Sequence, residues 1–531
     1  MAMGLQIKRA AALAALALAV AATAQPAGKN YEQAVLAIQQ QIQGGNLEQA
    51  RTLVLAAEKT YPADGGLENL HGVIAVQQGK TDEARTEFAA AVRHSPKLVS
   101  AYLNLGRIYM ENAGHAADAN VKALSVYERA LAIAPDTGEA HYYAALVLMR
   151  TGKYAQSKQH LAKLPAEDRQ RIGTLLIECA DEAGLGHTAE TDRDAAALAA
   201  QADLAESDVQ ETLPALLAAR RADLAETLLT AAASHQPLSP AGLRTLGLAQ
   251  EAEGKLPAAR ETLERAFAAD SKSKTILVDL ARVAEAAKDY TGALGYVAHA
   301  RDLDPKDASL AYLFGSICVK MSLLSEARKA LAEALALEPE NPGYNYAMGM
   351  VVTFAENPNA ALPYFEKFHK LRPDDASGIL ALGTTYFRAK EYESAGPWLK
   401  QAAEKQATTA TALYYMARIA RQEGHAEDAL AELNHAAELD RDRPDILAEL
   451  GQTYLQMKRF PEAEKQLDRA AALEPENYAA NFGLLQLYAR TADPRREEQS
   501  KRFEAIKQKN EEQLRDSMRA IEIRPQGEPA K

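Results

Sequence analysis

The chain of 531 residues has little cysteine, tryptophan or aromatic side chain of any kind. It contains two cysteines and one tryptophan, and aromatic residues make up 6% of the whole. Few aromatic residues and abundant alanine disfavour a β-sandwich, which needs more β-branched and aromatic side chains. The composition therefore favours helices that pack through small residues.

The chain also lacks an excess of positive charge. Its formal net charge is −12, whereas a nucleic-acid-binding protein presents a basic stripe. The acidic balance favours solubility and disfavours nucleic acid as the partner.

Signatures of common enzymes and metal sites are missing from the sequence. It has no His-Glu-x-x-His, Gly-x-Ser-x-Gly or Cys-x-x-Cys motif. Gly-Lys-Thr at 79–81 has Ile74 where a phosphate-binding loop needs a glycine, and a helix is expected before it instead of a strand. His425 and His435 straddle an expected turn, so we do not expect them to bind a metal. The sequence therefore predicts no catalytic residue, no metal site and no cofactor.

Long apolar runs are absent except near the N-terminus. Lys8 and Arg9 precede the run AALAALALAV at 11–20, and the small-x-small pattern Ala-Thr-Ala ends at Ala24. A segment this short cannot cross a bilayer, which needs about 20 apolar residues. Residues 1–24 are therefore predicted to be a secretory signal peptide that is cleaved after Ala24. We expect the mature chain to be soluble and exported, either periplasmic or secreted.

What the sequence does contain is a 34-residue repeat. The pentapeptide LEPEN occurs at Leu337–Asn341 and at Leu473–Asn477, which are four times 34 residues apart. The alanines that recur every 34 residues are Ala225, Ala259, Ala293, Ala327, Ala361, Ala395, Ala429 and Ala463. The bulky residues four places after them are Leu229, Leu263, Val297, Leu331, Phe365, Leu399, Leu433 and Leu467. This spacing predicts a helix face against which a second helix packs closely.

The repeat also indicates where helices end and begin. A proline often follows the repeated alanine by twelve places, and it ends the helix because it has no amide hydrogen. An Asn or Asp then follows, as at Asn341, Asp375 and Asn477, and is expected to cap the next helix. The glycines expected to close the first helix of a unit in a left-handed conformation are Gly45, Gly79, Gly152, Gly254 and Gly424. A glycine also occurs within the first helix of several units, twelve residues before the alanine, as at Gly315, Gly349, Gly383 and Gly451.

These features together resemble the tetratricopeptide repeat (TPR) family. The pair AYLNLGRIYM at 101–110 and ALSVYERALAIAP at 123–135 carries nearly all of the family pattern. The segment ILAELGQTYLQMKRFPEAEKQLDRAAALEP at 446–475 carries it without an insertion. The resemblance implies an all-α fold, an α-solenoid of about 13 helix-turn-helix units in a right-handed superhelix with a C-terminal capping helix. The leader sequence suggests an exported bacterial type.

The repeat register divides the chain into segments. We predict a signal peptide over 1–24, an N-terminal array of about four repeats over 25–165 with a five-residue insertion around 112–122, a divergent helix pair over 166–205, a regular array of eight 34-residue repeats over 206–477, capping helices over 478–523 and a disordered tail over 524–531. Pro214 falls inside the first helix of a unit and is expected to kink it. Cys179 and Cys318 lie about four repeats apart, too far for a disulfide, so we predict two free and mostly buried thiols.

The resemblance also implies where a partner binds. In TPR proteins the first helices line the concave side and usually contact partners from their second, fifth, ninth and twelfth places. Those places and their neighbours give the predicted protein-binding residues Tyr312, Tyr346, Met350, Phe387, Arg388, Tyr414, Arg418 and Arg421. Tyr142, Met149, Phe482 and Gln486 occupy equivalent places. Exposed aromatic and arginine side chains are typical interface anchors, but a structural role stays open because the fifth place can pack partly against the next repeat.

The function implied by the resemblance is a non-enzymatic periplasmic scaffold or adaptor that holds a segment of a partner protein in the concave groove. The alternative is an accessory subunit of a cell-envelope machine for polysaccharide export or outer-membrane assembly. The Lys and Asn with which some members clamp a C-terminal carboxylate are absent, as at Tyr312 and Ser316, so recognition of chaperone tails is disfavoured. The first hypothesis expects a soluble protein partner, whereas the alternative expects association with membrane or glycan in an envelope complex. Neither expects nucleic acid as a partner or a membrane span after signal cleavage.

Overall fold

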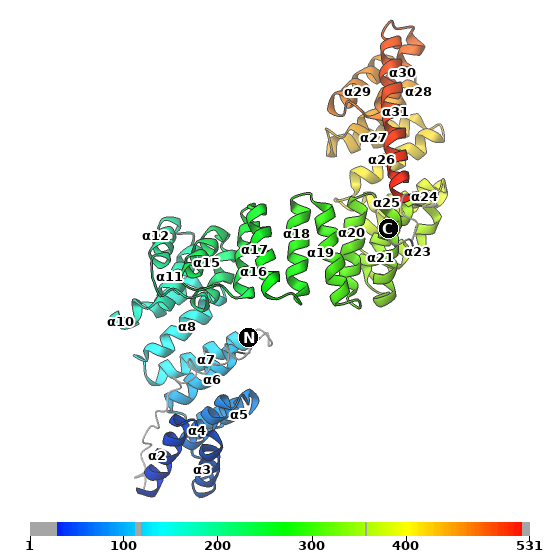
Figure 1. The fold of residues 1–531 in the computed structure, drawn as a ribbon. Helices are drawn as coiled ribbons and strands as arrows, with labels where there is room; N and C mark the ends of the chain where they lie inside the picture. Colours follow the sequence, from blue (N-terminus) through cyan, green and yellow to red (C-terminus); the bar gives the residue numbers. More distant parts are fainter. Residues whose placement is uncertain (1–28, 112–117, 356–357, 523–531) are drawn as a thin grey trace, which may run out of the picture. The chain divides into compact units, whose positions relative to one another are not determined.

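The computed structural model describes residues 29–111, 118–355 and 358–522 (Figure 1). These residues form a succession of helices and contain no strand, which confirms the predicted all-α repeat fold. The chain divides into two compact units, unit 1 over Met1–Asp270 and unit 2 over Ser271–Lys531. The predicted signal peptide, the predicted tail and most of the predicted insertion lie outside the described residues.

Unit 1 holds helices α2 to α17, and most of them pack against the next helix along the chain. Their bounds are α2 Lys29–Gln43, α3 Leu47–Thr60, α4 Gly65–Gln77, α5 Thr81–His94, α6 Val99–Glu111, α7 Ala119–Ile133, α8 Gly138–Arg150, α9 Tyr154–Leu161, α10 Ala166–Arg169, α11 Ile172–Leu185, α12 Thr188–Ala199, α13 Glu206–Gln210, α14 Leu213–Ala218, α15 Ala222–His235, α16 Pro240–Ala252 and α17 Leu256–Ala269.

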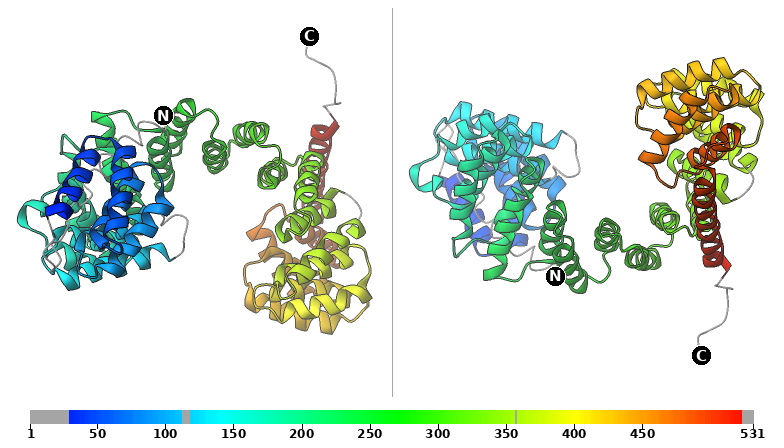
Figure 2. Two further views of the ribbon diagram at one scale, coloured as in Figure 1. Left: turned by 90° about the horizontal axis from the view of Figure 1, so that it is seen from below. Right: turned by 90° about the horizontal axis from the view of Figure 1, so that it is seen from above.

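Unit 2 holds helices α18 to α31, of which α31 is the long red helix in Figure 2. Their bounds are α18 Lys274–Ala286, α19 Tyr290–Leu303, α20 Ala308–Lys320, α21 Leu324–Leu337, α22 Pro342–Ala355, the 3-10 turn η1 Pro358–Ala361, α23 Leu362–Leu371, α24 Ala376–Arg388, α25 Tyr392–Ala403, α26 Thr409–Gln422, α27 Ala426–Leu439, α28 Pro444–Gln456, α29 Phe460–Leu473, α30 Tyr478–Thr491 and α31 Arg496–Glu522.

The residues that repeat every 34 positions lie in the cores of both units. All eight repeated alanines are fully buried, and the bulky residues four places after them are at most 1% exposed. Five of these bulky side chains lie against a glycine on the first helix of the same pair: Leu263, Leu331, Phe365, Leu399 and Leu467. A Cβ atom added at Gly349 would lie 2.7 Å from the Phe365 ring, and one added at Gly383 would lie 2.8 Å from Leu399 Cδ2. The glycine on the first helix therefore makes room for the bulky residue on the second.

The predicted helix ends are where the pattern places them. The side chains of Asp375 and Asn477 accept hydrogen bonds from the amides of Ser377 (2.9 Å) and Ala480 (2.8 Å), as N-caps do. The five glycines predicted to close first helices all have positive φ, between 73° and 89°. Local sequence therefore determines the boundaries of most helix pairs.

The structure departs from the pattern near Pro214. We expected one kinked helix there, but the chain forms two short helices, α13 and α14, separated after Gln210. Pro214 lies in the first turn of α14, where its missing amide hydrogen leaves no hydrogen bond unmade. Proline therefore starts a new helix at this position.

The end of unit 2 and the two thiols complete the fold. Helix α31 packs on α30 and buries Phe503 and Ile506, whereas the side chains of Leu514, Met518 and Ile521 lie outside the described residues. Cys179 and Cys318 are both free and fully buried, as predicted. Within the described part of the chain no helix combines the length and apolar content needed to cross a membrane.

Candidate partner-binding groove

The first helices of successive pairs in unit 2 form a common face. Helix α20 contacts α22, α24 contacts α26, α26 contacts α28, and α28 contacts α30. Each of these helices also packs against the second helix of its own pair, so the opposite side of each is covered. We call this surface, made by α22, α24, α26, α28 and α30, the first-helix face.

A first hollow of about 280 Å³ lies between α22, α24 and α26. Tyr346, Met350 and Arg388, three of the predicted binding residues, line it. The remaining lining residues are Thr353, Phe365, Ser377, Leu380, Ala381, Thr384, Thr385, Thr408, Thr411 and Tyr415. Met350 is 38% exposed, so an apolar side chain is available to a partner at this place.

A second hollow of about 730 Å³ lies between α26, α28 and α30. Its lining residues are Arg421, Gln452, Leu455, Gln456, Lys458, Phe460, Phe482, Gln486 and Arg490. Three of these side chains are cationic, and none of the described lining residues is acidic. Helix α26 contributes to both hollows, through Tyr415 to the first and Arg421 to the second.

Arg418 and Arg421 also have a structural role. The Arg421 guanidinium donates to Glu449, which is 5% exposed, and Arg418 Nε lies 3.8 Å from the other oxygen of the same carboxylate. The Arg418 guanidinium also lies 4.9 Å from the centre of the Phe387 ring, a cation–π contact. These two arginines therefore bind the chain's own buried carboxylate, and neither is simply a free anchor.

The other predicted residues pack within the unit. Tyr312 stacks on Tyr344 with ring centres 5.0 Å apart, and Phe387 is only 7% exposed. Burial raises the pKa of Tyr414 to about 12, and the Arg418 guanidinium lies 5.4 Å from its ring. Tyr312, Phe387 and Tyr414 therefore have a structural role. The hollows are lined instead by Tyr346, Met350, Arg388 and Arg421.

Several lining residues escaped the sequence prediction because they are neither aromatic nor charged. Ser377, Leu380 and Thr384 occupy the second, fifth and ninth places of the unit that starts at Ala376, which the TPR resemblance marks as contact places. On helix α24, the position within the repeat therefore indicates which residues line the hollow better than the residue type does.

Unit 1 has a hollow whose volume lies between those of the two hollows in unit 2. A hollow of about 520 Å³ is lined by Arg107, Tyr142 and Arg171 among others, and it includes Tyr142 from the equivalent places named above. Met149, from the same set, is 1% exposed and belongs to the core.

Comparison with known proteins starts from family sequence models. Two models described as "Tetratricopeptide repeat" match the chain, one at residues 113–176, 251–317 and 420–482 and the other at 69–119 and 213–274. Together they match just over half of the chain. A model described as "Regulator of microtubule dynamics protein 1-3" matches residues 295–422. No curated protein sequence matches the chain.

Solved structures with a similar arrangement have low sequence identity. The chain is similar to a tetratricopeptide repeat protein from Parabacteroides merdae, at 19% identity over 48% of this chain and 99% of that one, with a TM-score of 0.39. It is also similar to yeast Tom70, at 17% identity over 85% and 92% of the two chains, with a TM-score of 0.38. The APC/C hetero-tetramer Cut9–Hcn1 matches at 15% identity over 87% and 90%, with a TM-score of 0.38. On the matched repeats and the fold described above, the chain belongs to the tetratricopeptide repeat family.

Proposed function

We propose that this chain is a non-enzymatic scaffold that binds a segment of a partner protein on the first-helix face of unit 2. TPR proteins typically mediate protein–protein interaction. The observation that carries the proposal is the pair of hollows between successive first helices, because they place exposed apolar and cationic side chains on one face. Concave sites with a few polar groups are the usual places for ligand segments.

The chemistry of the two hollows suggests the character of the partner segment. Met350, Leu380 and Tyr415 offer an apolar seat in the first hollow, with Arg388 as its charged residue. Lys458 and Arg490 add positive charge in the second hollow, although the chain as a whole carries a net charge of −12. A segment with an apolar anchor followed by acidic residues matches this order.

Selection of peptides from a random display library tests this proposal directly. The selected peptides should combine an apolar anchor with Asp or Glu, and Met350→Glu should raise their Kd at least tenfold, about 1.4 kcal/mol. Arg388→Glu should weaken binding in the same direction by removing the charge complementarity.

The matched control is Leu337→Glu, because Leu337 is an equally exposed apolar residue (44%) on the second helix α21. This variant should bind the selected peptides with unchanged Kd in fluorescence anisotropy. If Met350→Glu binds as tightly as the parent chain, or if Leu337→Glu loses binding, the first-helix face of unit 2 is not the binding surface.

We further propose that the scaffold acts outside the cytoplasm, in the bacterial periplasm. The basic start, the apolar run at 11–20 and the pattern that ends at Ala24 support this location. Expression of the full sequence in a bacterium, followed by fractionation and mass spectrometry, tests it. A periplasmic chain that begins at Gln25 is expected; an unprocessed cytoplasmic chain would contradict the export.

A further inference from the structure

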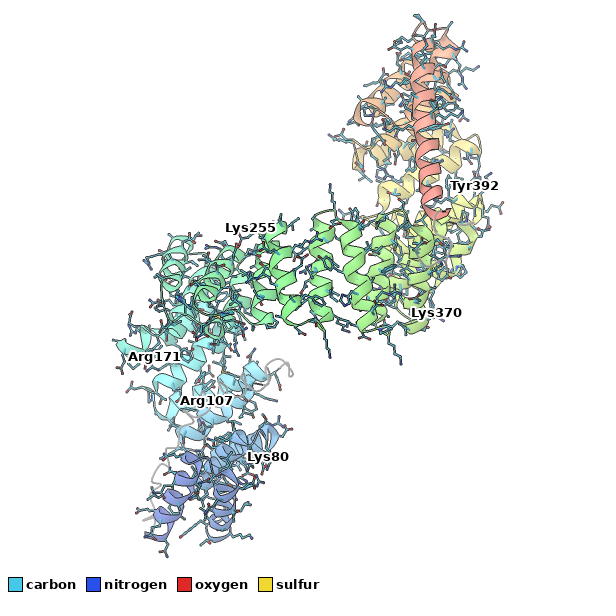
Figure 3. The ribbon with its side chains drawn as sticks, viewed as in Figure 1. Lys80, Arg107, Arg171, Lys255, Lys370 and Tyr392 are labelled. Carbon is cyan, nitrogen blue, oxygen red and sulfur yellow. The ribbon has the colours of Figure 1, made fainter. Side chains whose placement is uncertain are left out.

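Unit 1 brings one histidine and three glutamates together from three helices. Glu58 lies near the end of α3, His71 lies in the middle of α4, and Glu83 and Glu87 lie on α5. In Figure 3, the label of Lys80 marks the turn that precedes α5. His71 Nδ1 is 3.1 Å from a Glu58 oxygen and 3.7 Å from a Glu87 oxygen. The three ligand atoms of Glu58, His71 and Glu87 all lie within 4.8 Å of one another.

The imidazole in this cluster is buried and incompletely bonded. His71 is 5% exposed, and its Nε2 atom makes no hydrogen bond to any described residue. That nitrogen is 3.4 Å from a Glu83 oxygen. A buried polar atom usually has a hydrogen-bond partner, so a ring that faces carboxylates on both nitrogens and satisfies only one of them is unusual for a purely structural histidine.

The cluster also holds more negative than positive charge. Arg51 pairs with Glu83 at 2.5 Å, which neutralises one of the three carboxylates. Glu58 and Glu87 remain, and within the described residues each of them pairs with His71. A dipositive ion beside a neutral imidazole and two carboxylates would balance these charges.

We propose that Glu58, His71 and Glu87 form a binding site for a divalent cation of the zinc class. His71 Nδ1 and one oxygen from each glutamate are the ligands, and His71 Nε2–H points toward Glu83. One imidazole and two carboxylates suit Zn²⁺ and its neighbours among the first-row divalent metals. A carboxylate on the far side of a ligating histidine is the usual outer partner at such sites, because it orients the ring.

The geometry needs only small side-chain movements to reach metal-ligand distances. The separations of 3.1 and 3.7 Å from Nδ1 are those expected between neighbouring ligands that each lie about 2.1 Å from one ion. The Glu58 and Glu87 side chains are about a quarter exposed (24% and 23%), so they can rotate, and water can complete the coordination.

The pKa values of Glu87 and His71 are both raised, in agreement with the excess of negative charge in the cluster. Burial raises the pKa of Glu87, and the neighbouring glutamates raise it further, with His71 acting in the opposite direction. Burial lowers the pKa of His71, but the hydrogen bond to Glu58 and the charges of Glu87 and Glu83 outweigh it and raise that pKa overall.

Sequence spacing could not reveal this site. The ligands are 13 and 16 residues apart on three successive helices, a pattern that no short metal-binding motif contains. The sequence accordingly predicts no metal site, and only the packing of α3, α4 and α5 brings these side chains together.

Isothermal titration with zinc chloride of the untagged full-length chain, after removal of metals with a chelator, tests the proposal. One saturable site per chain is expected. Glu87→Gln, which preserves side-chain size, and His71→Asn should each weaken zinc binding at least tenfold. Cobalt(II) should give a visible absorption band in the parent chain that both variants lose.

The matched control is the His94–Glu68 pair, which joins α4 and α5, two of the three helices of the cluster, with a shortest N–O distance of 2.7 Å. His94→Asn should leave zinc affinity and the cobalt spectrum unchanged. The proposal is overturned if the parent chain shows no one-to-one zinc site, if Glu87→Gln binds zinc as tightly as the parent chain, or if binding is lost in His94→Asn. If His71→Asn fails to fold, the zinc affinity of Glu87→Gln alone tests the proposal.

Discussion

At Asp181 on α11 the chain buries a carboxyl group that is 0% exposed. Neither of its oxygens makes a hydrogen bond to a described residue, and the nearby Ser157 hydroxyl donates instead to the Ala145 carbonyl at 3.0 Å. Burial raises the pKa of this carboxyl group to about 8. Asp181 is therefore protonated in the folded chain at neutral pH, whereas it ionises near pH 4 in the unfolded chain.

This difference makes stability depend on pH. Between about pH 4 and pH 8 the folded state binds a proton at Asp181 that the unfolded state has released, so the free energy of unfolding should fall as pH rises through this window. Asp181→Asn should remove this contribution and stabilise the chain at pH 8 by about 1 kcal/mol or more, with a smaller effect at pH 4, because each tenfold change in proton affinity is worth about 1.4 kcal/mol.

Denaturant unfolding of the parent and variant chains at pH 4, 6 and 8 measures this effect. Asp203→Asn is the control, because Asp203 is exposed in the same unit. A stability difference between Asp181→Asn and the parent chain that is the same at all three pH values would show that Asp181 is ionised in the folded state.

At the scale of the helix pair, one turn position has the same backbone conformation at seven places in the described residues. The second residue after the first helix has positive φ at Arg220, Gly254, Lys288, Ser322, Lys390, Gly424 and Lys458, each separated from the next by 34 or 68 residues. Residues other than glycine are strained there by about 1–2 kcal/mol. The helix pairs therefore accept local strain at the same turn wherever glycine is absent.

Replacing such a residue by glycine should relieve the strain. Lys390 has a backbone φ of 63° and an exposed side chain. Lys390→Gly should raise the free energy of unfolding by about 0.5–1 kcal/mol, after the extra conformational freedom of glycine in the unfolded chain is subtracted. Thermal unfolding followed by circular dichroism measures it. Gly424→Ala, at the equivalent turn one repeat later, should shift the midpoint in the opposite direction; a lower midpoint for Lys390→Gly would contradict the strain argument.

At the scale of the whole molecule, the repeat array of unit 2 ends on helix α31. Phe503 of α31 lies against the rings of Tyr478 and Phe482 on α30, with centres 4.9 and 5.4 Å apart. Gln499 donates to the Asn481 carbonyl at 3.0 Å. Solenoid arrays need such a terminal cap because each repeat covers an apolar face of its neighbour.

Removal of this cap should cause the chain to self-associate. A chain that ends after Asp493 loses α31 and exposes the side of α30 that Phe503 and Ile506 now cover. It should form oligomers in size-exclusion chromatography with light scattering, and its midpoint of thermal unfolding should fall. A chain that ends after Glu522 keeps α31 and is the matched control; identical behaviour of the two chains would show that α31 is not a cap.

Most of the fold could be predicted from the sequence because its determinants repeat. The buried alanines, the glycines that accommodate bulky residues and the capping Asp and Asn side chains each recur in register, so a single rule covers many helices. The prediction failed at Pro214 because proline can end, kink or start a helix, and tertiary packing decides which. The predicted division of the chain into segments stays a prediction.

The candidate sites were predictable only in part. Tyr346, Met350 and Arg388 line the first hollow and were singled out because aromatic, apolar and arginine side chains at contact places are conspicuous; their role in binding a partner stays a prediction. The internal partner of Arg421, Glu449, lies 28 residues away on another helix, so sequence spacing did not reveal it. The cluster around His71 depends on three helices in the same way. Side-chain contacts between different repeats are thus the part of the structure that the repeat pattern does not predict.

The fit between Gly349 and Phe365, and between Gly383 and Leu399, has a consequence for how such a chain can change in length. Both members of each tight fit belong to the same 34-residue segment, so a tandem duplication in the gene copies a bulky side chain together with the space that receives it. An array of this kind can therefore grow or shrink by whole segments in a single genetic event without a clash inside any copied pair.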